Sequence, residues 1–275
     1  MLGLEPLPLL DDADVSSTRL CGEVDSAERP MSAEQIAVAL IAVVAGSLLK
    51  SISGVGLPLV TIPAIAYVAD VETAVAVTSV PNLALNGALA WRERSAAGET
   101  RDLPVLGATG FVGAIGGTLL LAWLPEAALI LLLVAVVFAY AVSYFTNPEF
   151  SLRPTTARRW SPFVGLSAGA MQGAVGISGP IVASWVHSYR LPRNAHIFSV
   201  TALFAFAGVA QVPALAIGGQ LDGRWWVALI ACVPALATVP IGTRLRNAMS
   251  AEGFDRFLVL TLVASVTGLA IRTFG

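Results

Sequence analysis

The chain has 275 residues, of which 56% are hydrophobic and only 12% are charged, and its mean hydropathy is +0.78. Soluble domains carry about 25% charged residues, so this composition is typical of a membrane protein. The formal net charge of -2 leaves no basic excess for binding nucleic acid, and Cys21 and Cys232 are too far apart in the chain to predict a disulfide framework or a zinc site.

Residues 1–32 differ from the rest because they are rich in aspartate and glutamate, with only Arg19 and Arg29 as basic residues. A secretory signal needs a basic start and an uninterrupted apolar run, whereas here an acidic cluster follows Leu10. Such polar, charged segments bury too little apolar surface to fold. We therefore expect a disordered acidic tail.

Long apolar segments follow the tail and reach or approach the roughly 20 residues that a spanning helix needs. They are continuously apolar, whereas the strands of membrane barrels alternate. The sequence therefore predicts an all-α polytopic membrane protein. These segments are residues 103–123, 125–146, 195–217, 225–243 and 254–271.

Short motifs of the first half recur in the same order 120 to 125 residues later. This series predicts two transmembrane repeats, 33–146 and 160–275, joined by a cytoplasmic linker at 147–159. Ala45-Gly46, Ser53-Gly54-Val55-Gly56-Leu57-Pro58, Thr78-Ser79, Gly87 and Gly117-Thr118 recur as Ala168-Gly169, Gly176-Ile177-Ser178-Gly179-Pro180, Ser199, Gly208 and Gly242-Thr243.

Each half opens with an apolar segment, a Gly/Ser/Pro break and a short apolar segment. One helix over 33–69 would be roughly 55 Å long, too long for a single crossing. We therefore expect hairpins in which 58–69 returns along 33–52, and 180–189 along 161–175. Three further crossings then place the second half on the opposite face, so the repeats have inverted topology.

The arginines orient these halves. We expect the protein to lie in the plasma (inner) membrane. The positive-inside rule then puts the arginine-rich loops in the cytoplasm and both termini outside. Trp91, Trp123, Trp160, Trp225 and Trp226 fall at predicted segment ends, where aromatic belts form. One face carries eleven arginines, at positions 92, 94, 101, 153, 158, 159, 190, 193, 244, 246 and 256, and the other carries Arg224 and Arg272.

The two breaks are the predicted site. Interrupted helices in inverted repeats are typical of secondary transporters, which bind substrate at the repeat interface. Glycine lets the backbone turn sharply and approach a ligand, and proline suits the first helical turn. The helix N-termini at the breaks would favour an anion. The alternative is that these glycines only allow close helix packing.

Lys50, the only lysine, immediately precedes the first break, and Gln172 is its approximate counterpart. A buried ammonium is usually functional, but Lys50 could instead snorkel to the interface. Thr78, Asn82 and Asn86 share one helical face, where interhelical hydrogen bonds are an alternative role. The predicted substrate-binding residues are Lys50, Ser51, Ser53, Gly54, Gly56, Pro58, Thr78, Ser79, Asn82, Gln172, Gly173, Gly176, Ser178, Gly179, Pro180 and Ser199.

Other chemistry is not indicated. The chain has no Walker A loop, and its carboxylates lie in the tail, loops and predicted segment ends, so neither ATP drive nor a buried carboxylate proton relay is expected. We predict no cofactor and no metal. His187 and His196 fall at a segment end beside arginines and are interpreted as interface residues.

The break after the first helix, its repetition near mid-chain and the Thr78-Ser79 pair resemble the sulfite exporter TauE/SafE family over residues 33–273. The resemblance implies a bacterial-type inner-membrane permease with seven to nine spans. The sequence departs from the family pattern at Phe198, which stands where the second Thr-Ser pair would have its threonine. We therefore expect a secondary transporter or facilitator that exports a small anion: sulfite, a sulfonate-related compound or an organic anion. Its expected partners are that anion and the lipid bilayer.

Two other functions stay open. Gly176-Ile177-Ser178-Gly179 fits the GxSG motif of rhomboid intramembrane proteases, in which the serine is the nucleophile and a histidine the base. That family's histidine lies on a much later helix, and no histidine follows His196. A non-transporting membrane assembly protein is the third possibility.

Overall fold

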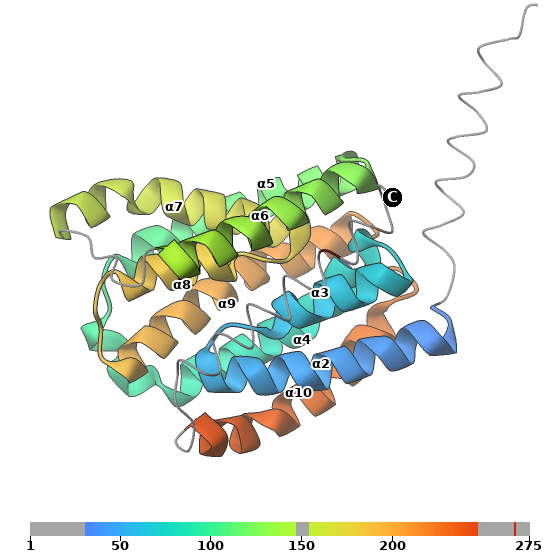
Figure 1. The fold of residues 1–275 in the computed structure, drawn as a ribbon, viewed down its shortest axis with the longest axis horizontal. Helices are drawn as coiled ribbons and strands as arrows, with labels where there is room; N and C mark the ends of the chain where they lie inside the picture. The colour runs from blue at the N-terminus through green and yellow to red at the C-terminus, as the bar shows by residue number, and fades with distance from the viewer. Residues whose placement is uncertain (1–30, 147–153, 247–266, 268–275) are drawn as a thin grey trace, which may run out of the picture.

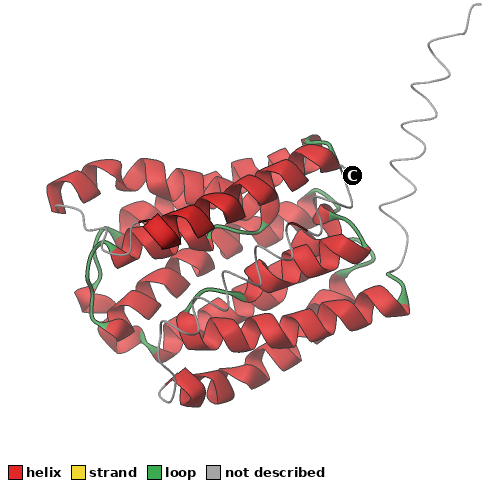
Figure 2. Cartoon of the chain, viewed as in Figure 1, coloured by secondary structure: helices red, strands yellow, loops and turns green. Residues whose placement is uncertain are grey.

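The computed structural model describes residues 31–146 and 154–246, together with Thr267, and over these ranges the chain is helical with no strand (Figures 1 and 2). The predicted all-α class is confirmed. The helices are α2 (Ala33–Ser53), α3 (Leu57–Val68), α4 (Val71–Arg92), the short 3-10 helix η1 (Arg94–Glu99), α5 (Leu103–Trp123), α6 (Glu126–Thr146), α7 (Pro154–Val175), α8 (Gly179–His187), α9 (Arg193–Ile217) and α10 (Trp225–Arg246).

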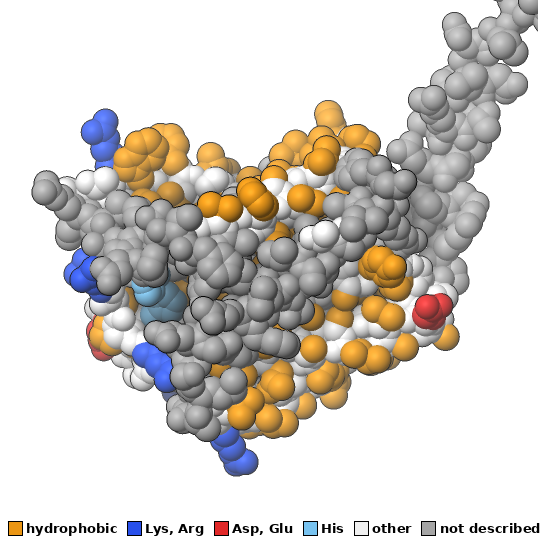
Figure 3. Space-filling view, in the orientation of Figure 1, with side chains coloured by type: hydrophobic (Ala, Val, Ile, Leu, Met, Phe, Trp, Pro, Cys, Tyr) orange, Lys and Arg blue, Asp and Glu red, His pale blue; other side chains and the backbone are white. Residues whose placement is uncertain are grey.

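Five of the described helices, α2, α4, α5, α9 and α10, are long and apolar enough to cross a membrane. Large apolar side chains are exposed on their outer faces, for example Ile41 on α2 and Val233 on α10, each about 70% exposed. Such surfaces are unfavourable in water but match the lipid hydrocarbon. Figure 3 shows this apolar cover on the flank of the bundle, with arginines gathered at one end.

The aromatic and basic residues mark the ends of the bundle. Trp91, Trp123 and Trp225 lie at or next to helix ends and are exposed, as predicted for an aromatic belt. The ends of α4, α8 and α10 and the starts of α5, α7 and α9 lie at the same end of the view in Figure 1. The described arginines at this end are Arg92, Arg94, Arg101, Arg158, Arg159, Arg190, Arg193 and Arg244.

The first hairpin is formed by α2 and α3. Ser32 begins α2 with a capping box to Gln35, and Gly54, at φ +84°, ends it by donating its N–H to the carbonyl of Lys50 at 2.7 Å. The chain then reverses. Gln35 Nε2 donates to the carbonyl of Val68 at 2.9 Å, so the end of α3 returns to the beginning of α2.

The second hairpin is formed by α7 and α8. Gly176, at φ +69°, ends α7 and donates its N–H to the carbonyl of Gln172 at 3.0 Å. Tyr189, just beyond α8, places its hydroxyl 3.4 Å from Ser161 Oγ near the start of α7. Both apolar segments therefore fold back on their predecessors, as the sequence predicted.

Some predicted boundaries change. Helix α7 begins at Pro154, so residues 154–159, expected in the linker, form its first turns; proline is well tolerated at a helix start. Residues 147–153, the predicted tail apart from Met31 and Ser32, and the last predicted apolar segment apart from Thr267 lie outside the described residues.

The two predicted halves are interleaved. Helix α5 packs against α7 and α9, while α10 packs against α2 and α4, and α4 contacts α9. The α5–α7 contact is a seam of glycines at four-residue or similar spacing. It allows the backbones to touch, as small residues do in membrane helix pairs. The seam consists of Gly110, Gly113 and Gly117 on α5 and Gly165, Gly169 and Gly173 on α7.

A substitution at Gly113 would test whether this seam holds α5 and α7 together. A Cβ there would overlap the carbonyl oxygen of Leu166 and lie 2.9 Å from the amide nitrogen of Ala170. Gly113→Val should therefore force α5 and α7 apart and destabilise the fold by about 1–3 kcal/mol or more. The measurement is the melting temperature of the detergent-purified protein, followed by size-exclusion chromatography.

Gly116→Val on the same helix is the matched control, because a Cβ at Gly116 meets nothing within 4 Å. We expect its melting temperature to stay near that of the wild type. Equal losses in the two variants would show that glycine is needed in α5 for a reason other than this contact.

Candidate functional site

The two helix breaks meet inside the bundle. A Cβ at Gly179, the first residue of α8, would lie 2.5 Å from Cγ1 of Val55 in the first break. A Cβ at Gly176 would lie 2.5 Å from Ile62 Cδ1 on α3, and one at Gly54 would lie 4.0 Å from Cγ1 of Ile197 on α9. Each break is therefore enclosed by helices of the other predicted half.

Glycine is required at these turns. Gly54, Gly56 and Gly176 have φ values of +84°, +147° and +69°, which L side chains rarely adopt. Gly179 has ordinary backbone geometry, and the contact with Val55 explains its lack of a side chain. Close helix packing, the alternative role considered for these glycines, therefore accounts for Gly179. The other three glycines are needed for the backbone conformation itself.

Both short helices begin without a side-chain cap. Gly56, before α3, has no side chain, and Ser178, before α8, makes no side-chain hydrogen bond to the first turn of its helix. Pro58 and Pro180 are the second residues of these helices, where a missing N–H leaves no hydrogen bond unmade. The remaining N–H groups of the first turns carry the positive ends of the helix dipoles.

Lys50 is buried beside the first break. The residue is only 1% exposed, and Nζ lies 4.4 Å from the centroid of the Phe204 ring on α9, a cation–π contact. Within the described residues, Lys50 makes no ion pair with a carboxylate. The side chain therefore points into the bundle and does not snorkel to its surface.

A chain of side-chain amides lies at the second break. Ser178 Oγ donates to Gln172 Oε1 at 2.9 Å, and Gln172 Nε2 donates to Gln211 Oε1 at 3.2 Å. Gln211 Nε2 in turn donates to the backbone carbonyl of Gln172 at 2.8 Å. Three buried residues from α7, the break and α9 are thus held in one network. Gln211 was absent from the predicted site, because a lone glutamine in an apolar helix does not show what it faces.

The predicted polar residues on α4 are buried. Thr78 Oγ1 donates to Thr61 Oγ1 on α3 at 3.1 Å, and Asn86 Nδ2 donates to Asn82 Oδ1 at 3.2 Å. Asn86 Oδ1 is buried without a partner in the described structure. The Thr78–Thr61 bond is therefore one of the interhelical hydrogen bonds that the sequence left as an alternative, whereas the Asn86–Asn82 bond lies within α4.

Four other predicted site residues are engaged in hydrogen bonds within their own helix or in packing against another helix. The hydroxyls of Ser79 and Ser199 donate to carbonyls of their own helices, at 2.8 Å and 2.7 Å. Ser51 faces Gly242 on α10, and Gly173 lies against the backbone of Ala114 on α5. Their place in a substrate site stays a prediction. Ser53 belongs to the end of α2, and its side chain is not described.

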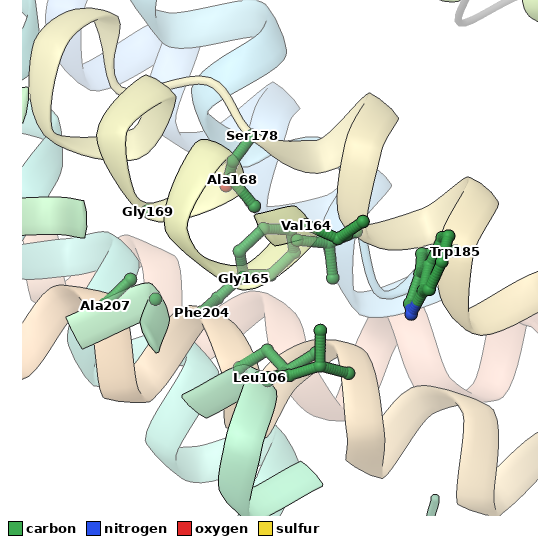
Figure 4. Close-up of a pocket in the computed structure, with 12 residues that line it drawn as sticks. Leu106, Val164, Gly165, Ala168, Gly169, Ser178, Trp185, Phe204 and Ala207 are labelled. Atoms are coloured by element: carbon green, nitrogen blue, oxygen red, sulfur yellow. The ribbon is translucent and has the colours of Figure 1, made fainter. Parts of the chain in front are cut away.

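A small cavity opens beside the second break (Figure 4). Its walls come from α5, α7, α8 and α9, and Ser178 and Phe204 both line it. Phe204 therefore touches the cavity as well as the ammonium of Lys50. Sequence reasoning missed Phe204, because one phenylalanine in a hydrophobic helix carries no sign of such a contact.

The sulfite exporter TauE/SafE family matches residues 38–269, a range that includes both breaks and most of the bundle. The chain belongs to this family. The match confirms the resemblance carried by the repeated glycine-proline breaks. No curated protein and no solved structure matches the chain. As a TauE/SafE protein it is a multi-pass membrane transporter of the sulfite or anion type.

Within the described part of this TauE/SafE chain, no cluster of three or more His, Cys, Asp or Glu side chains could hold a metal ion. The rings of His187 and His196 lie 6.3 Å apart between centroids, at the arginine-rich end. The chemistry gathered at the breaks is therefore that of one ammonium, side-chain amides, hydroxyls and helix N-termini.

Gly56 gives a direct test of the first break. A side chain there would be strained at φ +147°, and its Cβ would lie 3.2 Å from both Leu49 Cβ and the amide nitrogen of Lys50. Such strain costs of order 1–3 kcal/mol. Gly56→Ala should therefore reorient Lys50 and reduce anion flux by about tenfold or more.

The measurement is the initial rate of sulfite flux in proteoliposomes, normalised to inserted protein. Gly87→Ala on α4 is the control, because a Cβ there meets nothing within 4 Å, and it should keep wild-type flux. Wild-type flux in Gly56→Ala would mean that the backbone of the first break does not shape the transport site.

Proposed function

We propose that this chain is a secondary transporter or facilitator that exports a small anion, such as sulfite, a sulfonate-related compound or an organic anion, across the plasma membrane. The observation that carries the proposal is the buried ammonium of Lys50 beside two helix breaks that contact each other. Substrate would bind there, between the two halves.

The sign of the charge supports an anion. A buried cation without a carboxylate partner is unfavourable, because desolvation removes its interactions with water. The ring of Phe204 offsets part of this loss. A bound anion would offset the rest, and the uncapped N-termini of α3 and α8 add positive partial charge from the two halves.

We infer further that residues 33–146 and 160–275 are inverted repeats, and the pattern of contacts supports this. The α2–α3 hairpin has its counterpart in α7–α8, the α5–α7 contact in α10–α2, and the α5–α9 contact in α10–α4. Each half therefore contributes one long helix that packs on the hairpin of the other.

Polar ties at the two ends of the bundle support the same relation. Asp102, just before α5, accepts a hydrogen bond of 3.2 Å from Tyr189 at the end of the second hairpin. Arg224, which stands 122 positions later and just before α10, pairs with Glu72 near the end of the first hairpin at 3.4 Å. In alternating access, the halves would rock about the site between these ties.

The arginine-rich end would face the cytoplasm by the positive-inside rule, which puts the acidic tail and both termini outside. A membrane potential that is negative inside then favours exit of an anion by roughly 2.3 kcal/mol per charge per 100 mV. Facilitated efflux therefore needs no other energy source.

A protease is not favoured by the contacts of Ser178. Its hydroxyl donates to the amide oxygen of Gln172, which cannot take a proton as a general base does. No observation in the described structure favours a second function over transport.

Proteoliposome flux tests the proposal. The wild type should show saturable sulfite efflux, and Lys50→Gln should lower it by about tenfold or more, since a charged hydrogen bond is worth roughly 1.5–3 kcal/mol. Lys50→Arg keeps the charge and should retain more flux than Lys50→Gln. Absence of saturable flux for every anion in a panel of inorganic, sulfonate and carboxylate anions would refute transport by this chain alone. Equal flux in the wild type, Lys50→Gln and Lys50→Arg would show that Lys50 is not part of the site.

Cysteine accessibility tests the orientation. In a background with Cys21→Ser and Cys232→Ala, Ser95→Cys at the arginine-rich end should react with a membrane-impermeant maleimide only after the cells are opened. Asp222→Cys, exposed between α9 and α10 at the opposite end, should react in intact cells. The reverse pattern would place the arginine-rich end outside.

A further inference from the structure

We propose that the cavity beside the second break is a subsite for a short apolar substituent of the transported anion. The substrate class would then be small organic anions with one or two carbons next to the charged group, bound in preference to fully hydrophilic inorganic anions. This inference rests on the proposed function, because it assumes that the anionic group binds at Lys50.

The cavity has the right place for such a subsite. Ser178, in the second break, lies at one end of it, and Phe204 forms part of its wall (Figure 4). The ammonium of Lys50 lies 4.4 Å from the centroid of the same phenylalanine ring. Phe204 therefore contacts both the proposed position of the anion and the cavity, so the substituent of an anion held at Lys50 would reach the cavity beside this ring.

The lining of the cavity favours carbon over water. Ser178 and Trp185 are the polar side chains in its described lining, and each donates its hydrogen bond to a residue that does not line the cavity. Ser178 donates to Gln172 at 2.9 Å, and Trp185 Nε1 donates to the hydroxyl of Tyr189 at 2.8 Å. A stable internal water needs two to four polar partners, so this cavity lacks what a water would require.

The size of the cavity limits the substituent. The cavity has a volume of about 20 Å³, which is room for about one or two waters or a group of one or two carbons. Gly165 and Gly169 in its wall belong to the α5–α7 seam, where a Cβ would overlap the backbone of α5. That wall is built of closely packed backbone, so it should not yield to a longer chain.

Variants in the wall should change which anion is preferred. Ala168→Val would fill the cavity from α7, and Val182→Leu would fill it from α8 should the first variant fold poorly. Val164→Ala would enlarge it. Leu166→Ala is the matched control, because Leu166 is on the same helix α7, is 45% exposed and does not line the cavity.

The experiment measures inhibition of sulfite flux in proteoliposomes by methanesulfonate, ethanesulfonate and butanesulfonate, a series with one head group and increasing carbon. Each methylene that enters the cavity should improve inhibition about fourfold, the factor that corresponds to about 0.8 kcal/mol. The wild type should therefore prefer ethanesulfonate to methanesulfonate and reject butanesulfonate.

The variants separate the possible outcomes. Ala168→Val should weaken inhibition by ethanesulfonate about tenfold relative to the wild type while sulfite flux stays within about twofold, and Val164→Ala should admit butanesulfonate. Leu166→Ala should leave the preference unchanged. Normal sulfite flux with no dependence on the carbon chain would overturn the subsite and leave the proposed function intact. Absence of saturable flux for any anion would instead overturn the proposed function, and the subsite with it.

Discussion

Backbone that leaves helical geometry inside a bilayer must be enclosed by protein, because lipid hydrocarbon offers no partner to its N–H and C=O groups. This constraint organises the whole bundle. The break at 54–56 lies against α8 and α9, and the break at 176–178 lies against α3 and α4. Helices from both halves must therefore interleave, and the glycine seam between α5 and α7 is one of the contacts that holds them so.

Enclosure of the breaks also explains the electrostatics of the candidate site. Burial that removes water from the backbone turns also removes it from Lys50, which stands one turn before Gly54. In such surroundings a positive charge and helix N-termini act strongly on a ligand, because little solvent screens them. The ring of Phe204, on α9, contacts the ammonium of Lys50 and also lines the apolar cavity. One side chain thus borders both a charged group and an apolar space.

Sequence periodicity and motif spacing predicted a large part of this arrangement. The positions of both breaks, the return of α3 along α2 and the placement of Trp91, Trp123 and Trp225 at helix ends agree with the structure. These features depend on local properties of the chain: length of apolar runs, the freedom of glycine and the fixed φ of proline. The start of α7 at Pro154 was missed, because its first turns are polar and carry Arg158 and Arg159.

The sequence by itself determined that the chain is helical, that it is a membrane protein, that it has two helix breaks and that its single lysine stands beside one of them. Only the tertiary structure decided that Lys50 points inward onto Phe204, that Gln211 joins Gln172 and Ser178, and that Val55 contacts Gly179. The reason is physical: these contacts join residues far apart in the chain. In helices that are apolar on nearly every face, the pattern of residues does not reveal which side meets a neighbour and which meets lipid.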